Sequence, residues 1–261
     1  RLDGMLSNYR PDSQWSEVNR DAAGRAVRVP AELFERVSEA LEYSRRSEGA
    51  FDITVGPLVK AWGFHGGTGQ RPSEEVIREA MARVGYGHVV LDTARSTISF
   101  ARAGVELDPG GIGKGYAVDR MVAILRRHGI DNALVSAARS SLYAMGAPPG
   151  QPGWPVVIGG PATGAREVRL VLADESLSSS GNTVKFFLAD GRTFGHVLDP
   201  RSGYPAGGVL AAVVAPRALD SEAWTKAVLV NGREWSAQHT PAGWRVLLCD
   251  GDRPSSCAWR H

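Results

Sequence analysis

Glu106-Leu-Asp-Pro-Gly-Gly-Ile-Gly-Lys-Gly-Tyr-Ala-Val-Asp119 carries more information about fold and ligand than any other stretch of this sequence. It follows a short apolar run, contains four glycines and one lysine, and ends inside a predicted amphipathic helix. A helix N-terminus has unpaired backbone N–H groups and partial positive charge, and glycines let a ligand approach those groups closely. A strand, a glycine turn and a helix in this order therefore suit a phosphate or pyrophosphate. The alternative is a tight turn whose glycines only permit a positive φ.

Two side chains of this stretch add chemistry to the turn. Lys114 supplies a point charge, and Asp108 can accept hydrogen bonds from a ribose, a base or a bound cation. The run reads GGxGKG, so it matches neither of the common nucleotide motifs GxxxxGK[ST] and GxGxxG.

Composition excludes several classes of protein. The 261 residues are 43% hydrophobic and 22% charged, as in an ordinary globular protein. A net charge of +2, with no basic run interleaved with aromatic residues, argues against a nucleic-acid surface. No apolar stretch approaches the ~18 residues that a membrane span needs. Cys249 and Cys257 could pair, but two thiols define neither a disulfide framework nor a zinc site, so the redox compartment stays open.

Hydrophobic periodicity predicts an α+β fold. Helices are expected at 31–47, 72–84, 114–128 and 221–230. Strands are expected at 89–91, 97–100, 105–107, 133–137, 142–145, 156–158, 167–172, 184–188, 193–198, 209–214 and 244–249. Runs of hairpins with helices inserted between them favour a mainly antiparallel sheet over a doubly wound parallel one.

Four further segments carry residues capable of chemistry. Residues 47–64 could wall a flat heterocycle, or form a plain loop with Asp52 as an N-cap. Residues 177–182 are rich in hydroxyls and are expected to form a turn. Residues 194–205 place His196 on a strand, where a lone histidine is usually structural. The fourth segment, 219–228, contains both carboxylates and a lysine.

In order and spacing, these segments resemble the FAD:protein FMN transferase (ApbE-type flavin transferase) family. The matching motifs lie at 7–19, 49–64, 108–119, 178–181 and 196–205, and together they span nearly the whole chain. The resemblance implies a T-fold-like α+β architecture in one domain over residues 1–261. The family's initial strand, with its Met-Gly pair, would precede Arg1.

The resemblance also implies an activity, which is metal-dependent transfer of FMN from FAD onto a threonine of an acceptor protein, with release of AMP. Two alternatives stay open. One is an FAD-binding protein without transferase activity, and the other is an FAD hydrolase giving FMN and AMP. The resemblance suggests the extracytoplasmic side of the cell envelope as the location.

Individual site residues follow from matching the motifs. His196 matches a histidine that assists the reaction, and an imidazole of near-neutral pKa suits removal of the hydroxyl proton. Gly111 matches the position that offers a backbone carbonyl to the cation, expected to be Mg²⁺. The positions that match flavin contacts are Tyr9, Ala50, Phe51, Asp52, Asp108, Lys114 and Leu198.

The remaining metal ligands depart from the family pattern A-D-x-x-[ST/D]-T. Glu222 stands at the aspartate position and Thr225 follows three residues later, so both are candidate ligands. Lys226 stands where the last threonine would be, and a charged lysine has no acceptor to offer a cation. Either Glu222 and Lys226 form an exposed i,i+4 pair, or the Lys226 ammonium replaces the metal as a built-in cation. Arg139 is a second departure, which either narrows the pocket or turns a charge toward a phosphate.

Overall fold

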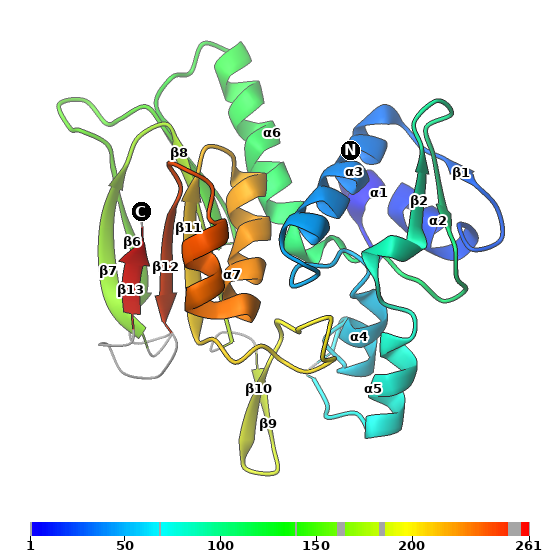
Figure 1. The fold of residues 1–261 in the computed structure, drawn as a ribbon. Coiled ribbons are helices and arrows are strands. Elements are labelled where there is room, and N and C mark those ends of the chain that lie inside the picture. The colour runs from blue at the N-terminus through cyan, green and yellow to red at the C-terminus, as the bar shows by residue number, and fades with distance from the viewer. Residues whose placement is uncertain are drawn as a thin grey trace. The chain divides into compact units, whose positions relative to one another are not determined.

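The computed structural model describes residues 2–67, 69–138, 140–160, 165–182, 186–249 and 257–260 (Figure 1). The chain divides into two compact units. The first unit is Arg1–Gly111 with Phe187–Pro205, and the second is Ile112–Phe186 with Ala206–His261. One domain over residues 1–261 stays a prediction.

The second unit is built on a six-stranded sheet in the order β13-β12-β11-β8-β5-β4, in which every neighbouring pair is antiparallel. All six residues of β11 are buried, which fits their continuous apolar sequence. The strands are β4 (Ala133–Ala137), β5 (Ser141–Met145), β8 (Glu175–Gly181), β11 (Leu210–Ala215), β12 (Arg245–Cys249) and β13 (Cys257–Arg260).

Different elements cover the two faces of this sheet (Figure 1). Helix α6 (Gly113–Arg127) packs on one face, where Val118 and Val122 contact side chains of β4 and β5. Helix α7 (Ala218–His239) packs on β8 and β11. The hairpin β6 (Trp154–Gly160) and β7 (Ala165–Leu172) shares a core cluster with Leu177, Ala212 and Leu247 of the sheet. The antiparallel α+β expectation is confirmed.

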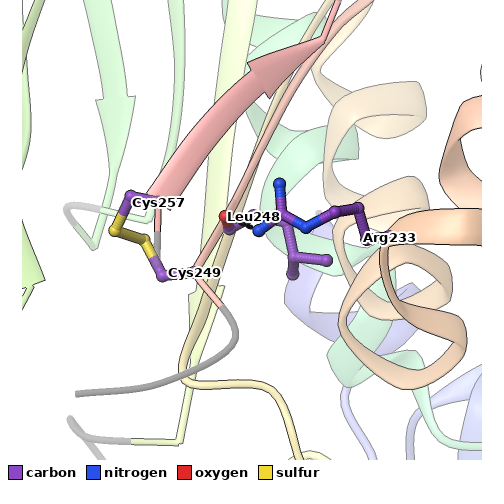
Figure 2. Close-up of a disulfide and its surroundings, with 4 residues drawn as sticks. All are labelled: Arg233, Leu248, Cys249 and Cys257. Atoms are coloured by element: carbon purple, nitrogen blue, oxygen red, sulfur yellow. Dashed lines mark hydrogen bonds between the residues drawn. A yellow bond between two sulfur atoms is a disulfide. The ribbon is translucent and has the colours of Figure 1, made fainter. Parts of the chain in front are cut away.

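A disulfide closes the last hairpin of the second unit. Cys249 and Cys257 are register partners on β12 and β13, and their sulfurs are bonded (Figure 2). Beside it, the Arg233 guanidinium donates to the Leu248 carbonyl at 3.3 Å. The question that the sequence left open, whether the two cysteines pair, is thereby answered.

The first unit combines short helices with small sheets. Its core includes Trp62, which is fully buried and donates from Nε1 to the Gly203 carbonyl at 2.8 Å. The helices are α1 (Leu2–Leu6), α2 (Gln14–Asp21), α3 (Ala31–Arg46), α4 (Gly56–Ala61), α5 (Glu74–Met81), η1 (Tyr86–His88) and η2 (Pro109–Gly111). The sheet order is β1-β3-β2, from Val27–Arg28, Thr97–Phe100 and Val89–Asp92, and a hairpin joins β9 (Phe186–Ala189) to β10 (Arg192–Gly195).

Three expectations about local structure are wrong. Of the segment 177–182, which was expected to form a turn, residues 177–181 instead belong to β8, an inner strand of the large sheet. Residues 105–107 form no meander strand, because the backbone groups of Leu107 bond to the side chains of Trp15 and Asn19 instead of a neighbouring strand. His196 lies one residue beyond the end of β10. Residues 184 and 185, at the start of another expected strand, lie outside the described residues.

Candidate active site

Asp108 organises the start of the glycine stretch in the first unit. Its backbone N–H donates to the Ile53 carbonyl at 2.7 Å, and its Oδ1 accepts from the Gly110 N–H at 2.7 Å. Its Oδ2 accepts from the Asn8 side chain at 3.2 Å. Asp108 therefore shapes η2 and ties it to the N-terminal segment, and its contact with a flavin stays a prediction.

None of the four glycines of this stretch has a positive φ, so the interpretation of a turn that needs left-handed glycines is wrong. Close approach explains two of them. A Cβ on Gly111 would lie 2.6 Å from a ring carbon of Phe51, and a Cβ on Gly115 would lie 2.2 Å from the Ala218 carbonyl oxygen. Gly111 therefore lets the turn lie on Phe51 in the first unit, and Gly115 lets α6 meet α7 in the second.

Asp52 anchors the loop that follows α3. Its carboxylate accepts from the Thr54 N–H at 2.8 Å, from the Thr54 hydroxyl at 2.7 Å and from the Tyr86 N–H at 2.8 Å. Burial raises the pKa of the Asp52 carboxyl, and the bonds from Thr54 and Tyr86 oppose that rise. The N-cap alternative is wrong, since α4 begins at Gly56 after Val55 with no side-chain cap.

A cavity of about 260 Å³ opens beside Asp52 within the first unit. Its walls come from the loop after α3, from η1 and from the turn that Arg201 occupies. That turn is closed by Asp199, whose Oδ1 accepts from both the N–H and the Nε of Arg201 at 3.0 Å. The lining residues are Glu48, Gly49, Asp52, Val84, Gly85, Tyr86, Gly87, Pro200 and Arg201. Among the predicted flavin contacts, Asp52 borders this cavity.

The other predicted residues of the first unit differ in accessibility. Tyr9 is 66% exposed, and its ring stacks on His65 with 4.7 Å between centroids. His196 is partly exposed, with its ring edge-on to Phe64 at 6.4 Å. Ala50, Phe51 and Leu198 are buried. Tyr9 and His196 are thus the side chains of this group that can meet a ligand directly, and the roles of all five stay predictions.

In the second unit, α6 and α7 are joined at their N-terminal ends. The Gly115 N–H donates to Glu222 Oε2 at 2.6 Å. In the reverse direction, Asp119 accepts from the Ala218 N–H at 2.7 Å and from the Leu219 N–H at 2.9 Å. Each helix therefore supplies a carboxylate to first-turn N–H groups of the other, which satisfies donors that lack intrahelical partners.

Two lysines surround the Glu222 carboxylate, which is only 1% exposed. Lys114 Nζ lies 2.9 Å and Lys226 Nζ 3.8 Å from Oε1, and Lys226 also donates to the Glu222 carbonyl at 3.0 Å. Burial lowers the pKa of Lys226 to about 8, with Glu222 opposing that effect and Lys114 reinforcing it. The interpretation of Glu222 and Lys226 as an exposed i,i+4 pair is wrong, because the carboxylate is inside the unit.

These contacts test whether a divalent cation fits. The Glu222 carboxylate is held by two ammonium groups and a backbone N–H, and the Thr225 hydroxyl pairs with the Glu222 carbonyl and with Ser180 at 2.7 Å each. As arranged here, they do not fit Mg²⁺, which needs oxygen ligands free to face it. Gly111, whose carbonyl was the third predicted ligand, belongs to the first unit, and its role stays a prediction. Across the described ranges there is no group of three or more His, Cys, Asp or Glu that could hold a metal. Mg²⁺ at Glu222 and Thr225 is what the resemblance implies, and the contacts of these two side chains in this structure do not support it.

A ladder of hydroxyls supports this region, and it was missed as a unit because the serines were interpreted as a turn. Ser176 and Ser178 of β8 contact Ser221 of α7 at 3.0 and 2.9 Å, and Ser180 contacts Thr225. The i, i+2, i+4 spacing of these serines places them on one strand face, which is the signal that could have found them.

Arg139, the second departure from the family pattern, lies outside the described residues. In the part of the chain that the structure describes, no helix is both long and apolar enough to cross a membrane.

Comparison with known proteins identifies the family to which this sequence and fold belong. A model of the ApbE family matches residues 1–243. The FAD:protein FMN transferase of Klebsiella pneumoniae is 31% identical over 240 residues, covering 90% of this chain and 73% of that protein. The enzyme of the same name from Treponema pallidum is 31% identical over 249 residues, covering 89% and 68%.

Solved structures agree. The apo form of the Pseudomonas stutzeri flavinyl transferase ApbE has a TM-score of 0.82 at 31% identity, covering 96% of this chain and 80% of that one. The ApbE protein of Thermotoga maritima has a TM-score of 0.84 at 29% identity, covering 95% and 82%. The family match spans nearly the whole sequence, and the fold is shared over the same length. This chain belongs to the ApbE family.

Proposed function

We propose that this chain is an FAD:protein FMN transferase, which moves FMN from FAD onto a threonine of an acceptor protein. The relatives at 31% identity carry this name, and they support the same reaction here. The observation that carries the proposal is the first turn of α6, where Lys114 and backbone N–H groups lie at a helix N-terminus suited to a pyrophosphate.

The proposed transfer involves no oxidation or reduction. The threonine oxygen forms a bond to the FMN phosphorus, and the phosphoanhydride bond to the adenylate breaks. AMP leaves with the bonding electron pair, and the threonine proton passes to a base. His196 is the proposed base, because its imidazole is partly exposed and an imidazole nitrogen can accept the hydroxyl proton. Lys114 stabilises the negative charge that develops on the phosphate oxygens.

Intact-mass spectrometry tests the proposal. The chain is incubated with FAD and an acceptor that related FAD:protein FMN transferases modify, and a variant acceptor with valine in place of the target threonine is the control. We expect the acceptor to gain one FMN less one water, with an equal amount of AMP released, and the valine acceptor to stay unchanged. Formation of FMN and AMP with an unmodified acceptor would instead identify a hydrolase. FAD binding without any turnover would identify a flavin-binding protein.

We further propose an extracytoplasmic location. The Cys249–Cys257 disulfide supports it, because such bonds persist in oxidising compartments and are rare in the cytosol. Alkylation of intact cells before lysis, followed by mass analysis of this hairpin, tests the location. Two alkylated thiols in the native host would contradict it.

A further inference from the structure

We infer that the ammonium groups of Lys114 and Lys226, fixed on the buried Glu222 carboxylate, supply the positive charge that neutralises the pyrophosphate of FAD, in place of a divalent cation. This inference rests on the proposed function and states which groups neutralise the negative charge of the bound FAD. It depends on Glu222, Lys114 and Lys226, which all lie in the second unit.

A charge count favours an anionic ligand at this place. Glu222 contributes one negative charge, and Lys114 and Lys226 contribute two positive ones at 2.9 and 3.8 Å from the same oxygen. One positive charge is therefore left uncompensated within the group. The positive end of α6, a helix of 15 residues, adds to it through the Gly115 N–H. A divalent cation would add two more charges of the same sign to this group.

The lysines are also held in place. Lys226 is 18% exposed, and its Nζ donates to the Glu222 carbonyl, so the ammonium cannot move freely into solvent. Lys114 is 38% exposed, which leaves part of its side chain accessible to a ligand. Glu222 Oε1 is buried without a hydrogen bond of suitable geometry among the described residues, and both ammonium groups lie within 4 Å of it. A fixed ammonium needs little reorganisation to stabilise a phosphate.

The substitution Lys226→Met removes the charge and keeps an unbranched stem. Binding is followed by flavin fluorescence in EDTA, with FAD, which carries the pyrophosphate, and with riboflavin, which has no phosphate. We expect EDTA and Mg²⁺ to leave the FAD affinity of the unaltered protein unchanged. Lys226→Met should weaken FAD binding roughly 10- to 100-fold, the range for losing a charged hydrogen bond, and leave riboflavin binding unchanged.

Two further variants complete the design. Arg127→Met removes one charge from an exposed position on α6 and should leave FAD affinity unchanged. Lys114→Met, at a more exposed lysine, should weaken FAD binding selectively even if Lys226→Met fails to fold. Lys226→Thr replaces the ammonium with a hydroxyl, and calorimetric titration with MgCl₂ should then detect metal binding that the unaltered protein lacks.

Two results would overturn the inference. One is FAD affinity in the unaltered protein that falls in EDTA and returns with Mg²⁺. The other is an equal loss of FAD and riboflavin affinity in both lysine variants, which would assign the lysines to structure alone. Failure of the proposed function is distinguishable. Transfer that occurs only with Mg²⁺ refutes the inference and supports the proposed function. Phosphate-selective FAD binding without transfer supports the inference and refutes the proposed function.

Discussion

Replacing Asp119 tests how α6 and α7 hold the lysine–glutamate group together. Its two carboxylate oxygens accept from the Ala218 and Leu219 N–H groups, and α7 has no other side-chain cap, because its N-cap residue Arg217 makes no cap bond. Ala218 and Leu219 are fully buried, so water cannot replace the lost acceptor. Losing a cap costs about 1–2 kcal/mol, and an unpaired buried donor about 1–3 kcal/mol. We expect Asp119→Ala to lower the free energy of unfolding by roughly 2–4 kcal/mol.

The pH dependence of Asp119→Asn gives the sharper test. Burial raises the pKa of the Asp119 carboxyl, although the Leu219 and Ala218 N–H groups oppose that rise. Above the unfolded pKa, the folded protein keeps a proton that the unfolded chain has lost, so this contribution to stability is lost as pH rises through the folded pKa. Asparagine does not titrate. The stability difference between the unaltered protein and Asp119→Asn should therefore shrink as pH rises above about 4, the ordinary pKa of an aspartate.

Urea denaturation followed by circular dichroism measures both effects. An unchanged slope of unfolding free energy against urea would show that the denatured state is unaffected. Ser73→Ala is the matched control, because Ser73 caps the exposed helix α5 through the Val76 N–H, and its loss should cost about 1 kcal/mol. The reasoning is refuted if Asp119→Ala costs no more than Ser73→Ala. It is also refuted if the Asp119→Asn difference grows with pH, since the two N–H bonds would then outweigh burial.

Four further outcomes follow from the site. His196→Ala should slow transfer by roughly 10²–10⁴-fold in single-turnover assays while FAD affinity stays nearly intact; an unchanged rate would make His196 structural. FAD should bind more tightly than FMN in a fluorescence titration, because the α6 N-terminus suits a pyrophosphate, and equal affinities would contradict this. Asp52→Ala should lower unfolding free energy by about 2–4 kcal/mol in urea, since it removes three hydrogen bonds from a buried loop, and a cost under about 1 kcal/mol would refute that role. Replacing Cys249 and Cys257 by serine should cost about 2.5 kcal/mol from loop entropy, and an unchanged urea midpoint would contradict it.

Hydrophobic patterns in the sequence predicted the elements whose buried side is made of apolar residues. The helices α3 and α6 were placed to within about two residues, because each has an apolar stripe and a clear end signal. Strand β11 was predicted from a continuous apolar run. Strand β8 was not, because one of its faces carries serines whose hydroxyls bond to other elements, among them Ser141 of β5, Ala215 of β11 and Ser221 of α7. Such pairing depends on tertiary neighbours that a local pattern does not contain.

The full length of α7 was missed for a related reason. The sequence indicated a helix at 221–230, whereas α7 runs from Ala218 to His239 with non-helical geometry at Gly232. Its first three turns are buried almost all round, so they lack the polar stripe that makes a surface helix recognisable. Short helices such as α1 and α4 were missed because neither completes two turns of periodicity.

Glu222 and Lys226 show where sequence reasoning about a site stops. A spacing of four residues on a helix predicts that the two side chains meet, and they do, but the same spacing describes a solvated pair worth a few tenths of a kcal/mol. What decides between the two is burial, and burial depends on Gly115, whose missing side chain lets α6 lie against the start of α7. That approach brings Lys114 and a backbone N–H onto the same carboxylate. The charge of the site is therefore set by Glu222 and Lys226 together with Lys114, which is far from both in sequence. A lysine at a metal-ligand position becomes informative only once its neighbours are known.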